Sequence, residues 1–201
     1  MRRNLIFQRI IAGFIFVYLV IFLLVMGTAV FSYNGLVSSS QAVDAQWNKL
    51  TTAFKSRADL ATGLAAMMQV SPSFHGTEPT AVADAHDAIA RLKVDPNQAP
   101  VEQDEVDQYG GAQTRFADAL SHLQGALAAQ PELVASADIK SLQAQLDDTA
   151  KQIETARQNY NASAEVFNRE TGRFPVALIV RTMGFIPKII YPSSAVPRAT
   201  K

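Results

Sequence analysis

Residues 139–167 read IKSLQAQLDDTAKQIETARQNYNASAEVF. Apolar and small side chains recur in them at alternating spacings of three and four residues, which places them on one side of an α-helix. Four heptads of this pattern predict a long, nearly straight helix of about 30 residues, roughly 45 Å in length. The positions of this seam are Ile139, Leu142, Leu146, Thr149, Ile153, Ala156, Tyr160, Ser163 and Phe167.

A second helical stripe begins at Val43 and predicts the partner of this helix. Its spacings of three, four and seven residues also define one face. We expect the two helices to run antiparallel, with Trp47 and Phe54 packed across from the aromatic residues Tyr160 and Phe167. The members of the second stripe are Val43, Trp47, Leu50, Phe54, Ala61, Leu64 and Met68.

Two shorter helical patterns lie between these segments. Residues 80–93 predict a short helix with Thr80 as a candidate N-cap. Spacings of four and three from Phe116 to Leu127 predict another helix, which ends or restarts at Pro131. Because no segment alternates at period two, the predicted fold class is all-α, an antiparallel helical bundle of long helices with coiled-coil-like packing.

Other residues interrupt or end these patterns. The stretch 94–111 is rich in Pro, Gly and acidic residues, so we expect it to be irregular near the prolines, with a turn at Gly110 and Gly111, although part of it could extend the following helix. The serines at 38–40 are compatible with either a linker or a turn of helix. Gly172 is the expected C-cap of the long helix, and Pro175 is the expected stop.

The N-terminal part indicates a membrane anchor. Residues 10–31 carry no charge and are almost wholly apolar. As a helix they would be about 33 Å long, enough to cross a hydrocarbon core of about 30 Å. Arg2, Arg3 and Arg9 precede this span, and the first basic residue after it is Lys49. The positive-inside rule therefore predicts that the N-terminus is cytoplasmic and that everything after residue 31 lies outside.

Two alternatives to an anchor follow from the same residues. A cleavable signal peptide has an apolar region of only about 7–15 residues, although the Gly-Thr-Ala sequence at 27–29 loosely resembles a cleavage site. A buried helix of a soluble protein seldom runs this far without a charge. The length of the apolar run favours an anchor that is not cleaved.

The predicted organisation has four parts, the last of which is a tail of distinct composition at residues 171–201. That tail carries five basic residues, no acidic one, and many apolar and aromatic side chains. It could lie on an anionic membrane surface. We favour a cap on the end of the bundle, because Pro187 and Pro192 would interrupt an interfacial helix. The parts are a cytoplasmic basic leader at 1–9, a transmembrane anchor at 10–31, the helical bundle at 32–170 and the tail at 171–201.

Composition and motifs argue against several classes of chemistry. Lys and Arg number 18, as do Asp and Glu, and the zero net charge argues against a nucleic-acid-binding protein. The chain has no cysteine, which excludes thiol nucleophiles and Cys-ligated metals. His75, His86 and His122 lack zinc-ligand spacing, and the acidic residues at 102–107 lack the EF-hand pattern. We therefore expect no enzyme activity, catalytic residue, metal site or cofactor.

Several short motifs follow the anchor. They are YNGLV at 33–37, VDAQW at 43–47, FKSRADL at 54–60, IETARQNYN at 153–161, FN at 167–168, FP at 174–175 and MGF at 183–185. In this order and spacing the chain resembles the LemA family of bacterial membrane-anchored helical proteins, from about residue 33 to residue 192. It departs from the family at Ser56, where the family has Arg, and at 61–64, where the family often has I-P-N-L.

The resemblance implies an antiparallel helical bundle behind a single span, and it implies no established reaction. Asn161 and Asn168 are seven residues apart, so they share a helix face beside the seam. They could satisfy polar groups across the bundle or present a polar strip to a partner. The candidate interaction or structural residues are Tyr33, Asn34, Trp47, Arg57, Arg157, Tyr160, Asn161, Asn168, Phe174, Pro175, Gly184 and Phe185.

These inferences predict an envelope protein that acts by binding. We expect a single-pass protein of the bacterial inner membrane whose periplasmic bundle serves as a scaffold or adaptor. Its expected partners are the lipid bilayer, through the N-terminal helix, and an unidentified protein or a second copy of the chain, but no nucleic acid. The alternatives are a membrane-associated hydrolase with a site assembled in space, and a lipid-binding envelope protein with a tunnel between its helices.

Overall fold

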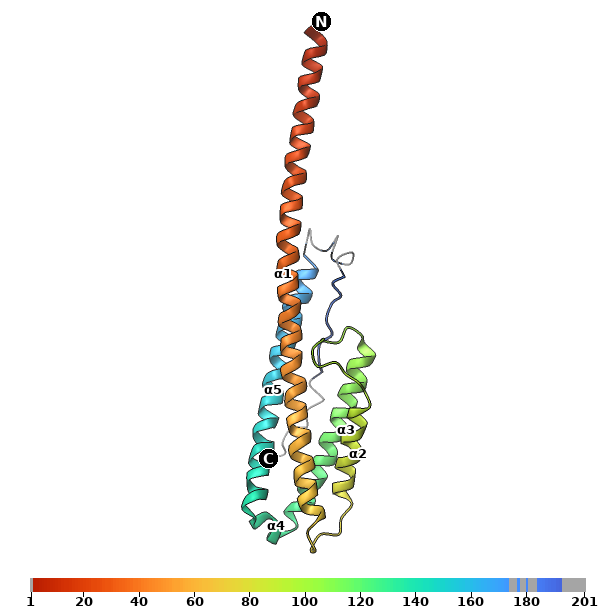
Figure 1. Ribbon diagram of the computed structural model, residues 1–201, viewed down its shortest axis with the longest axis vertical. Helices are drawn as coiled ribbons and strands as arrows, with labels where there is room; N and C mark the ends of the chain where they lie inside the picture. Colours follow the sequence, from red (N-terminus) through yellow and green to blue (C-terminus); the bar gives the residue numbers. More distant parts are fainter. Residues whose placement is uncertain (1, 174–176, 178–179, 181–183, 193–201) are drawn as a thin grey trace.

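The computed structural model describes residues 2–173, 177, 180 and 184–192, and leaves the side chains of residues 2–12, 24–26 and 28–32 outside the description. These described residues contain no β-strand, which confirms the all-α fold class. Their helices follow one another as in Figure 1. They are α1 (Arg2–Gln69), α2 (Glu78–Ala90), α3 (Gln103–Ala128), α4 (Pro131–Ala135) and α5 (Ala137–Thr171).

The helices form two antiparallel pairs. Helix α5 runs back along α1, while α2 and α3 form a second pair that packs against α1 (Figure 1). The short helix α4 joins the ends of α3 and α5. The N-terminal part of α1 extends well beyond all the other helices, so α1 is both a member of the bundle and a long projection from it.

Helix α1 is continuous through the serines at 38–40, which form helix turns and not a linker. It ends at Gln69, shortly before Pro72, whose ring and missing N–H are incompatible with a helix interior. Of the predicted anchor, residues 10–12, 24–26 and 28–31 are outside the residues with described side chains. Among the residues that the structure does describe in full, no helix is both long and apolar enough to cross a membrane.

Helix α5 confirms the prediction from the heptad pattern. It has 35 residues and ends at Thr171, and the N–H of its C-cap residue Gly172 donates to the carbonyl oxygen of Asn168 at 3.2 Å. Most seam positions are buried, but near the C-terminal end the buried position shifts from Ser163 to Ala164. The expected stop at Pro175 lies outside the described residues.

The second half of the stretch 94–111 extends the following helix, because α3 begins at Gln103. The prediction of a turn at Gly110 and Gly111 was wrong, since both lie inside α3. The first turn carries Asp104 and Glu105, whose charges are favourable at the positive end of the helix dipole. A row of buried residues, among them Val106 and Tyr109, attaches this turn to the core. Burial therefore outweighs the low helix propensity of glycine, about 1 kcal/mol per residue.

The start of α2 also differs from the prediction. Its N-cap is Thr77 and not Thr80, and Pro79 lies in the first turn. Proline is tolerated there because the first N–H groups of a helix have no intrahelical partner. Helix α4 likewise begins at Pro131, so both prolines start helices instead of breaking them.

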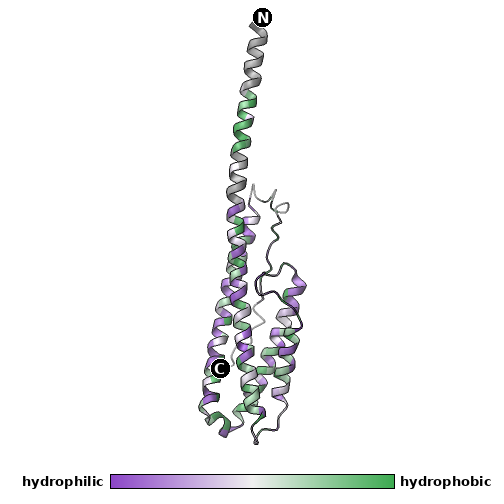
Figure 2. Ribbon diagram, viewed as in Figure 1, coloured by the Kyte–Doolittle hydropathy of each residue, from purple (hydrophilic) through white to green (hydrophobic). Residues whose placement is uncertain are grey.

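The buried apolar side chains form two clusters along the bundle. The first surrounds Trp47, Phe54 and Tyr160, and the second surrounds Leu64, Phe116 and Leu123 near the α4 end. Along the described part of the bundle, hydrophilic and hydrophobic residues are interspersed on each helix (Figure 2), and the exposed positions are mostly polar. Arg57 contacts the rings of both Phe54 and Phe116, so it lies at the boundary between the two clusters.

The predicted packing of α1 against α5 is confirmed at one of its two aromatic pairs. The ring centroids of Trp47 and Tyr160 are 5.3 Å apart. Phe54 does not face Phe167; it packs against Tyr109 and the C-terminal tail. In an antiparallel pair, seven residues forward on one helix are opposite seven residues backward on the other. Phe54 and Phe167 each lie seven residues further along their own helix than the Trp47–Tyr160 contact. Because the helices are antiparallel, the two residues therefore lie on opposite sides of that contact.

The position of Gly110 inside α3 gives a direct test of this fold. A Cβ at Gly110 would lie 3.6 Å from the Tyr191 hydroxyl oxygen, an ordinary contact distance. We expect Gly110→Ala to raise the free energy of unfolding by about 0.5–1 kcal/mol, because alanine favours a helix interior. Thermal unfolding of the detergent-solubilised chain, followed by circular dichroism, measures this change.

Gly184 is the matched control, since its φ of +81° disfavours any side chain although a Cβ there would meet nothing within 4 Å. Gly184→Ala should lower the free energy of unfolding by about 1–2 kcal/mol. A Gly110→Ala variant that melts at a lower temperature than the wild type would contradict the helical assignment.

Candidate functional site

The described part of the tail runs along the side of the bundle. We call residues 185–192 the strap, and two asparagines of α5 hold it. The Nδ2 group of Asn168 donates to the carbonyl oxygen of Lys188 at 2.8 Å, and its Oδ1 accepts the Lys188 N–H at 2.8 Å. Asn161 makes the same pair of bonds with Tyr191, both at 2.9 Å. Each asparagine thus satisfies both backbone polar groups of one strap residue.

The spacing of the two asparagines determines the conformation of the strap. Seven residues of α-helix span about 10.5 Å. The strap covers this distance with three residues, which requires about 3.5 Å per residue and therefore an extended chain. The hydroxyl of Tyr160 donates to the carbonyl oxygen of Ile189 at 2.7 Å, between the two asparagine contacts. The strap runs antiparallel to α5, with its backbone bonded to side chains of a helix.

Tyr191 inserts its ring into a buried aromatic cluster. Its centroid lies 6.1 Å from Trp47, 5.9 Å from Phe54 and 6.5 Å from Tyr109. The indole N–H of Trp47 donates to the carbonyl oxygen of Asp95 at 3.0 Å, which attaches the loop between α2 and α3 to the same cluster. The strap therefore contributes a side chain to the core and completes it between α1 and α3.

Lys188 is the second strap side chain that is buried, with 8% of its surface exposed. Its ammonium donates to Asp44 Oδ1 at 3.2 Å and to the carbonyl oxygen of Ala99 at 3.4 Å. The same carboxylate oxygen accepts the N–H of Ala99 at 2.9 Å. This ion pair between the buried Lys188 and the partly exposed Asp44 joins the strap, α1 and the loop before α3. Removing Asp44 would leave the buried Lys188 charge without its counter-ion, so the pair fixes the place of the strap.

Arg57 is buried with its charge against amide and aromatic groups. Its guanidinium donates to Gln113 Oε1 at 2.9 Å and to the Gln113 carbonyl oxygen at 3.3 Å. It also lies 5.3 Å from the ring centroid of Phe54 and 5.4 Å from that of Phe116. Burial lowers the pKa of Arg57 to about 10, so the side chain stays charged at neutral pH. Its Nε atom is buried without a hydrogen-bond partner.

The buried tyrosines keep their protons at neutral pH. Burial raises the pKa of Tyr109 to about 12. Burial likewise raises the pKa of Tyr160 and of Tyr191 above the ordinary value of 10.0. These hydroxyls can therefore donate hydrogen bonds but cannot accept protons as bases at neutral pH. The arrangement is suited to holding a polypeptide backbone.

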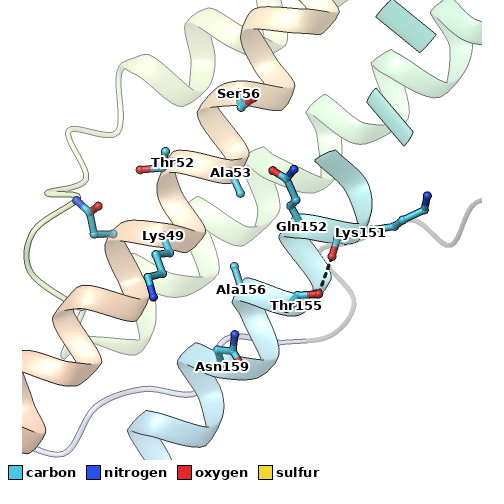
Figure 3. A pocket seen from close by; sticks show the side chains of 10 residues that line it. Lys49, Thr52, Ala53, Ser56, Lys151, Gln152, Thr155, Ala156 and Asn159 are labelled. Atoms are coloured by element: carbon cyan, nitrogen blue, oxygen red, sulfur yellow. Dashed lines mark hydrogen bonds between the residues drawn. The ribbon is translucent and has the colours of Figure 1, made fainter. Parts of the chain in front are cut away.

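A groove follows the outer face of the α1–α5 pair (Figure 3). It has a volume of about 620 Å³, and the buried residues Ala53 and Ala156 are among those that line it. Its other lining includes Thr52, Gln152 and Thr155, which are exposed polar residues. The titratable groups with a shifted pKa lie elsewhere. Across the described part of the chain, no three His, Asp or Glu side chains are placed to hold a metal ion.

Comparison with known proteins identifies the family. The model of the LemA family matches residues 46–199, which include Trp47 and the whole strap. The chain belongs to the LemA family. No protein with a curated function matches this LemA-family chain.

The structure brings five of the candidate residues together around the strap. Trp47 packs against Tyr191 of the strap, and the Tyr160 hydroxyl bonds to the strap backbone. Arg57 lies on the same helix as Trp47 and contacts the ring of Phe54, which packs against Tyr191. In this structure the two asparagines, Asn161 and Asn168, bind the backbone of their own chain's tail. The five residues are Trp47, Arg57, Tyr160, Asn161 and Asn168.

The remaining candidate residues that the structure describes form no side-chain hydrogen bond with the asparagines or Tyr160. Phe185, the first residue of the strap, directly follows the positive-φ residue Gly184, and its ring packs edge-to-face against Tyr33 with centroids 5.7 Å apart. Asn34 is exposed, and Arg157 makes a two-point contact with Glu154 on the surface of α5, at 2.6 and 3.0 Å. Two candidates, Phe174 and Pro175, lie outside the described residues.

Sequence reasoning missed the other half of the site. Tyr191 and Lys188 belong to a tail that is described above by its composition, and no sequence signal pairs Asp44 with that tail. A signal existed for Lys188, because a single charge inside an otherwise apolar run requires a buried partner or an exposed position. No local signal identified Tyr109, which lies in the stretch that reads as irregular, or Gln113, which lies between that stretch and the helical pattern from Phe116.

Tyr160 and Tyr191 allow a matched test of the strap, because the hydroxyl group has a hydrogen-bond partner in one tyrosine and none in the other. The Tyr160 hydroxyl donates to Ile189, whereas the Tyr191 hydroxyl is buried without a hydrogen-bond partner. We expect Tyr160→Phe to lower the free energy of unfolding by about 1–2 kcal/mol and Tyr191→Phe to raise it by up to about 1 kcal/mol. Urea unfolding at pH 7 measures both changes.

The pH dependence provides a control for the same pair of variants. Above pH 10 the unfolded chain loses tyrosine protons that the native chain retains, so the free energy of unfolding falls as pH rises. Each substitution removes one such group and should make this fall shallower. Equal effects of both variants at pH 7 would contradict the hydrogen bonding described for Tyr160 and Tyr191.

Proposed function

We propose that this protein is a single-pass membrane protein of the bacterial envelope whose helical bundle binds protein partners as a scaffold. Membership of the LemA family is consistent with an envelope protein of helical fold. The proposal has two parts, an anchor that holds the chain in the inner membrane and a bundle that acts outside it by binding.

The observation that carries the anchor is the surface of α1 at residues 13–23. Their side chains are exposed around the whole helix, with Phe14 67% and Leu19 53% exposed, and the segment stands clear of the bundle (Figure 2). Soluble proteins rarely expose contiguous apolar surface of this extent. The uncharged run at 10–31 has the length needed to cross a bilayer, which supports lipid as the medium that covers it.

The orientation proposed for the chain follows from its charges. Arginines at 2, 3 and 9 lie on one side of the span, and the next basic residue on the other side is Lys49. This asymmetry favours a cytoplasmic N-terminus and a periplasmic bundle.

A role in binding is supported by the chemistry of the buried site. Arg57 stays charged and the buried tyrosines stay neutral at neutral pH, and the asparagine hydrogen bonds are directed at a polypeptide backbone. The hydrolase alternative would need a nucleophile beside a base with a shifted pKa, and the lipid alternative would need an apolar tunnel. The α1–α5 groove is open and partly lined by polar side chains, so neither alternative gains support from it.

Cysteine labelling tests the topology, because the chain has no cysteine of its own. We expect a membrane-impermeant maleimide to label Thr80→Cys, on the exposed face of α2, in intact spheroplasts. Asn4→Cys, in the leader, should react only after the membrane is permeabilised. Labelling of Asn4→Cys alone in intact spheroplasts would reverse the orientation, and recovery of the protein in the soluble fraction would contradict the anchor.

Crosslinking in intact cells tests the binding role. We expect an affinity-tagged full chain, purified after crosslinking, to carry a distinct second protein in stoichiometric amount. The matched control is residues 1–37 fused to an unrelated folded domain, which shares the anchor and lacks the bundle. Recovery of the same proteins with both baits, or of no protein beyond the bait, would count against a scaffold.

A further inference from the structure

We propose that the strap groove is a binding site for an extended segment of a partner protein in which a lysine precedes an aromatic residue by three positions. The strap groove is the surface formed by Asp44, Trp47, Tyr160, Asn161 and Asn168. In this structure the strap occupies it as an intramolecular ligand. The proposal rests on the proposed function, because it names the site and the partner chemistry through which the bundle would bind.

The groove recognises backbone atoms first. Five hydrogen bonds hold the strap through its backbone, four from Asn161 and Asn168 and one from Tyr160. Any extended polypeptide without proline at the two asparagine contacts offers the same N–H and C=O groups at the same spacing. Backbone bonds of this kind supply affinity in many complexes with extended peptides, and side-chain pockets supply specificity.

Two pockets then select side chains. Lys188 reaches Asp44 and the Ala99 carbonyl oxygen, and Tyr191 fills the aromatic cluster beside Trp47. Ile186 is 55% exposed and Ile190 is 39% exposed, so these positions impose little selection. Ile189 is partly buried against the core cluster, which favours an apolar residue there. The groove therefore reads the pattern Lys-apolar-x-Tyr. Phenylalanine should also be accepted at the last position, because the Tyr191 hydroxyl has no hydrogen-bond partner.

A partner segment must compete with the strap for this groove. The strap belongs to the same chain, which gives it the high effective concentration of an intramolecular ligand. A partner therefore binds weakly while the strap is in place and more tightly once the strap is displaced. This competition makes the strap a built-in inhibitor of its own groove.

Fluorescence anisotropy with a defined peptide tests the proposal on the full chain in detergent. The probe is a labelled peptide with the sequence of residues 185–192, FIPKIIYP, and the control peptide is FIPSIISP. We expect the probe to bind the strap-weakened variant Lys188→Ser/Tyr191→Ser at least about tenfold more tightly than the wild type. In the strap-weakened chain, adding Asn161→Ala/Asn168→Ala should weaken binding at least about tenfold, whereas adding Asn159→Ala, a change on the same helix outside the groove, should not.

Several results would overturn the proposal. They are equal binding of the probe to the wild type and the strap-weakened variant, equal binding of the control peptide, and equal effects of the two asparagine changes. If the probe binds only weakly while the wild-type chain doubles in mass, and the double asparagine change abolishes this dimer, the occupant is the tail of a second copy and not a separate partner.

Hydrogen exchange on the wild-type chain covers the case in which a variant fails to fold. The amides of Lys188 and Tyr191 donate to the asparagine side chains. Excess FIPKIIYP should make the strap amides exchange faster, and FIPSIISP should not; no difference between the peptides would overturn the proposal. Peptide binding in the groove without any partner in the crosslinking experiment would overturn the proposed function alone. A partner recovered equally with Asn161→Ala/Asn168→Ala would overturn only the groove.

Discussion

The packing around Trp47 is the contact on which the rest of this bundle depends. Its ring lies 5.8 Å from Tyr109 of α3, 5.3 Å from Tyr160 of α5 and 6.1 Å from Tyr191 of the strap, and its N–H holds the loop before α3. Three helices, a loop and the tail therefore meet at one fully buried side chain. Tilted and edge-to-face contacts of this kind each contribute about 0.5–1.5 kcal/mol beyond the burial of area. The tail is thus part of the core, and the helical bundle is incomplete without it.

The buried polar groups determine where the tail lies more than how strongly it binds. A shift of the strap by one residue would put Ile189 and Pro192, or Pro187 and Ile190, in the places of Lys188 and Tyr191. Either shift would bring a proline, which has no N–H, to an asparagine that accepts a backbone N–H. It would also remove the cation from the Asp44 carboxylate. The ion pair and the two asparagine contacts therefore set the register together.

The long elements of this fold were predictable because their signals are local and repeated. The heptad pattern gave α5 to within a few residues, and the stripe from Val43 gave its partner. The start of α3 was not predictable, because Gly110 and the neighbouring acidic residues favour irregular structure locally and only burial against the strap reverses this. The candidate site was half predictable: its asparagines recur in a family motif, but Lys188 and Asp44 are 144 residues apart and no local pattern links them.

The unbroken course of α1 also sets the mechanics of the molecule. No turn or linker separates the apolar projection from the part that packs against α5, so the two share one axis (Figure 1). With the proposed anchor embedded in lipid, about 57 Å of α1 would continue beyond residue 31. An ordinary helix tilt of about 20° would then swing the far end of the bundle sideways by about 20 Å. Such a lever would convert small changes in the seating of the anchor into large displacements of whatever the bundle holds.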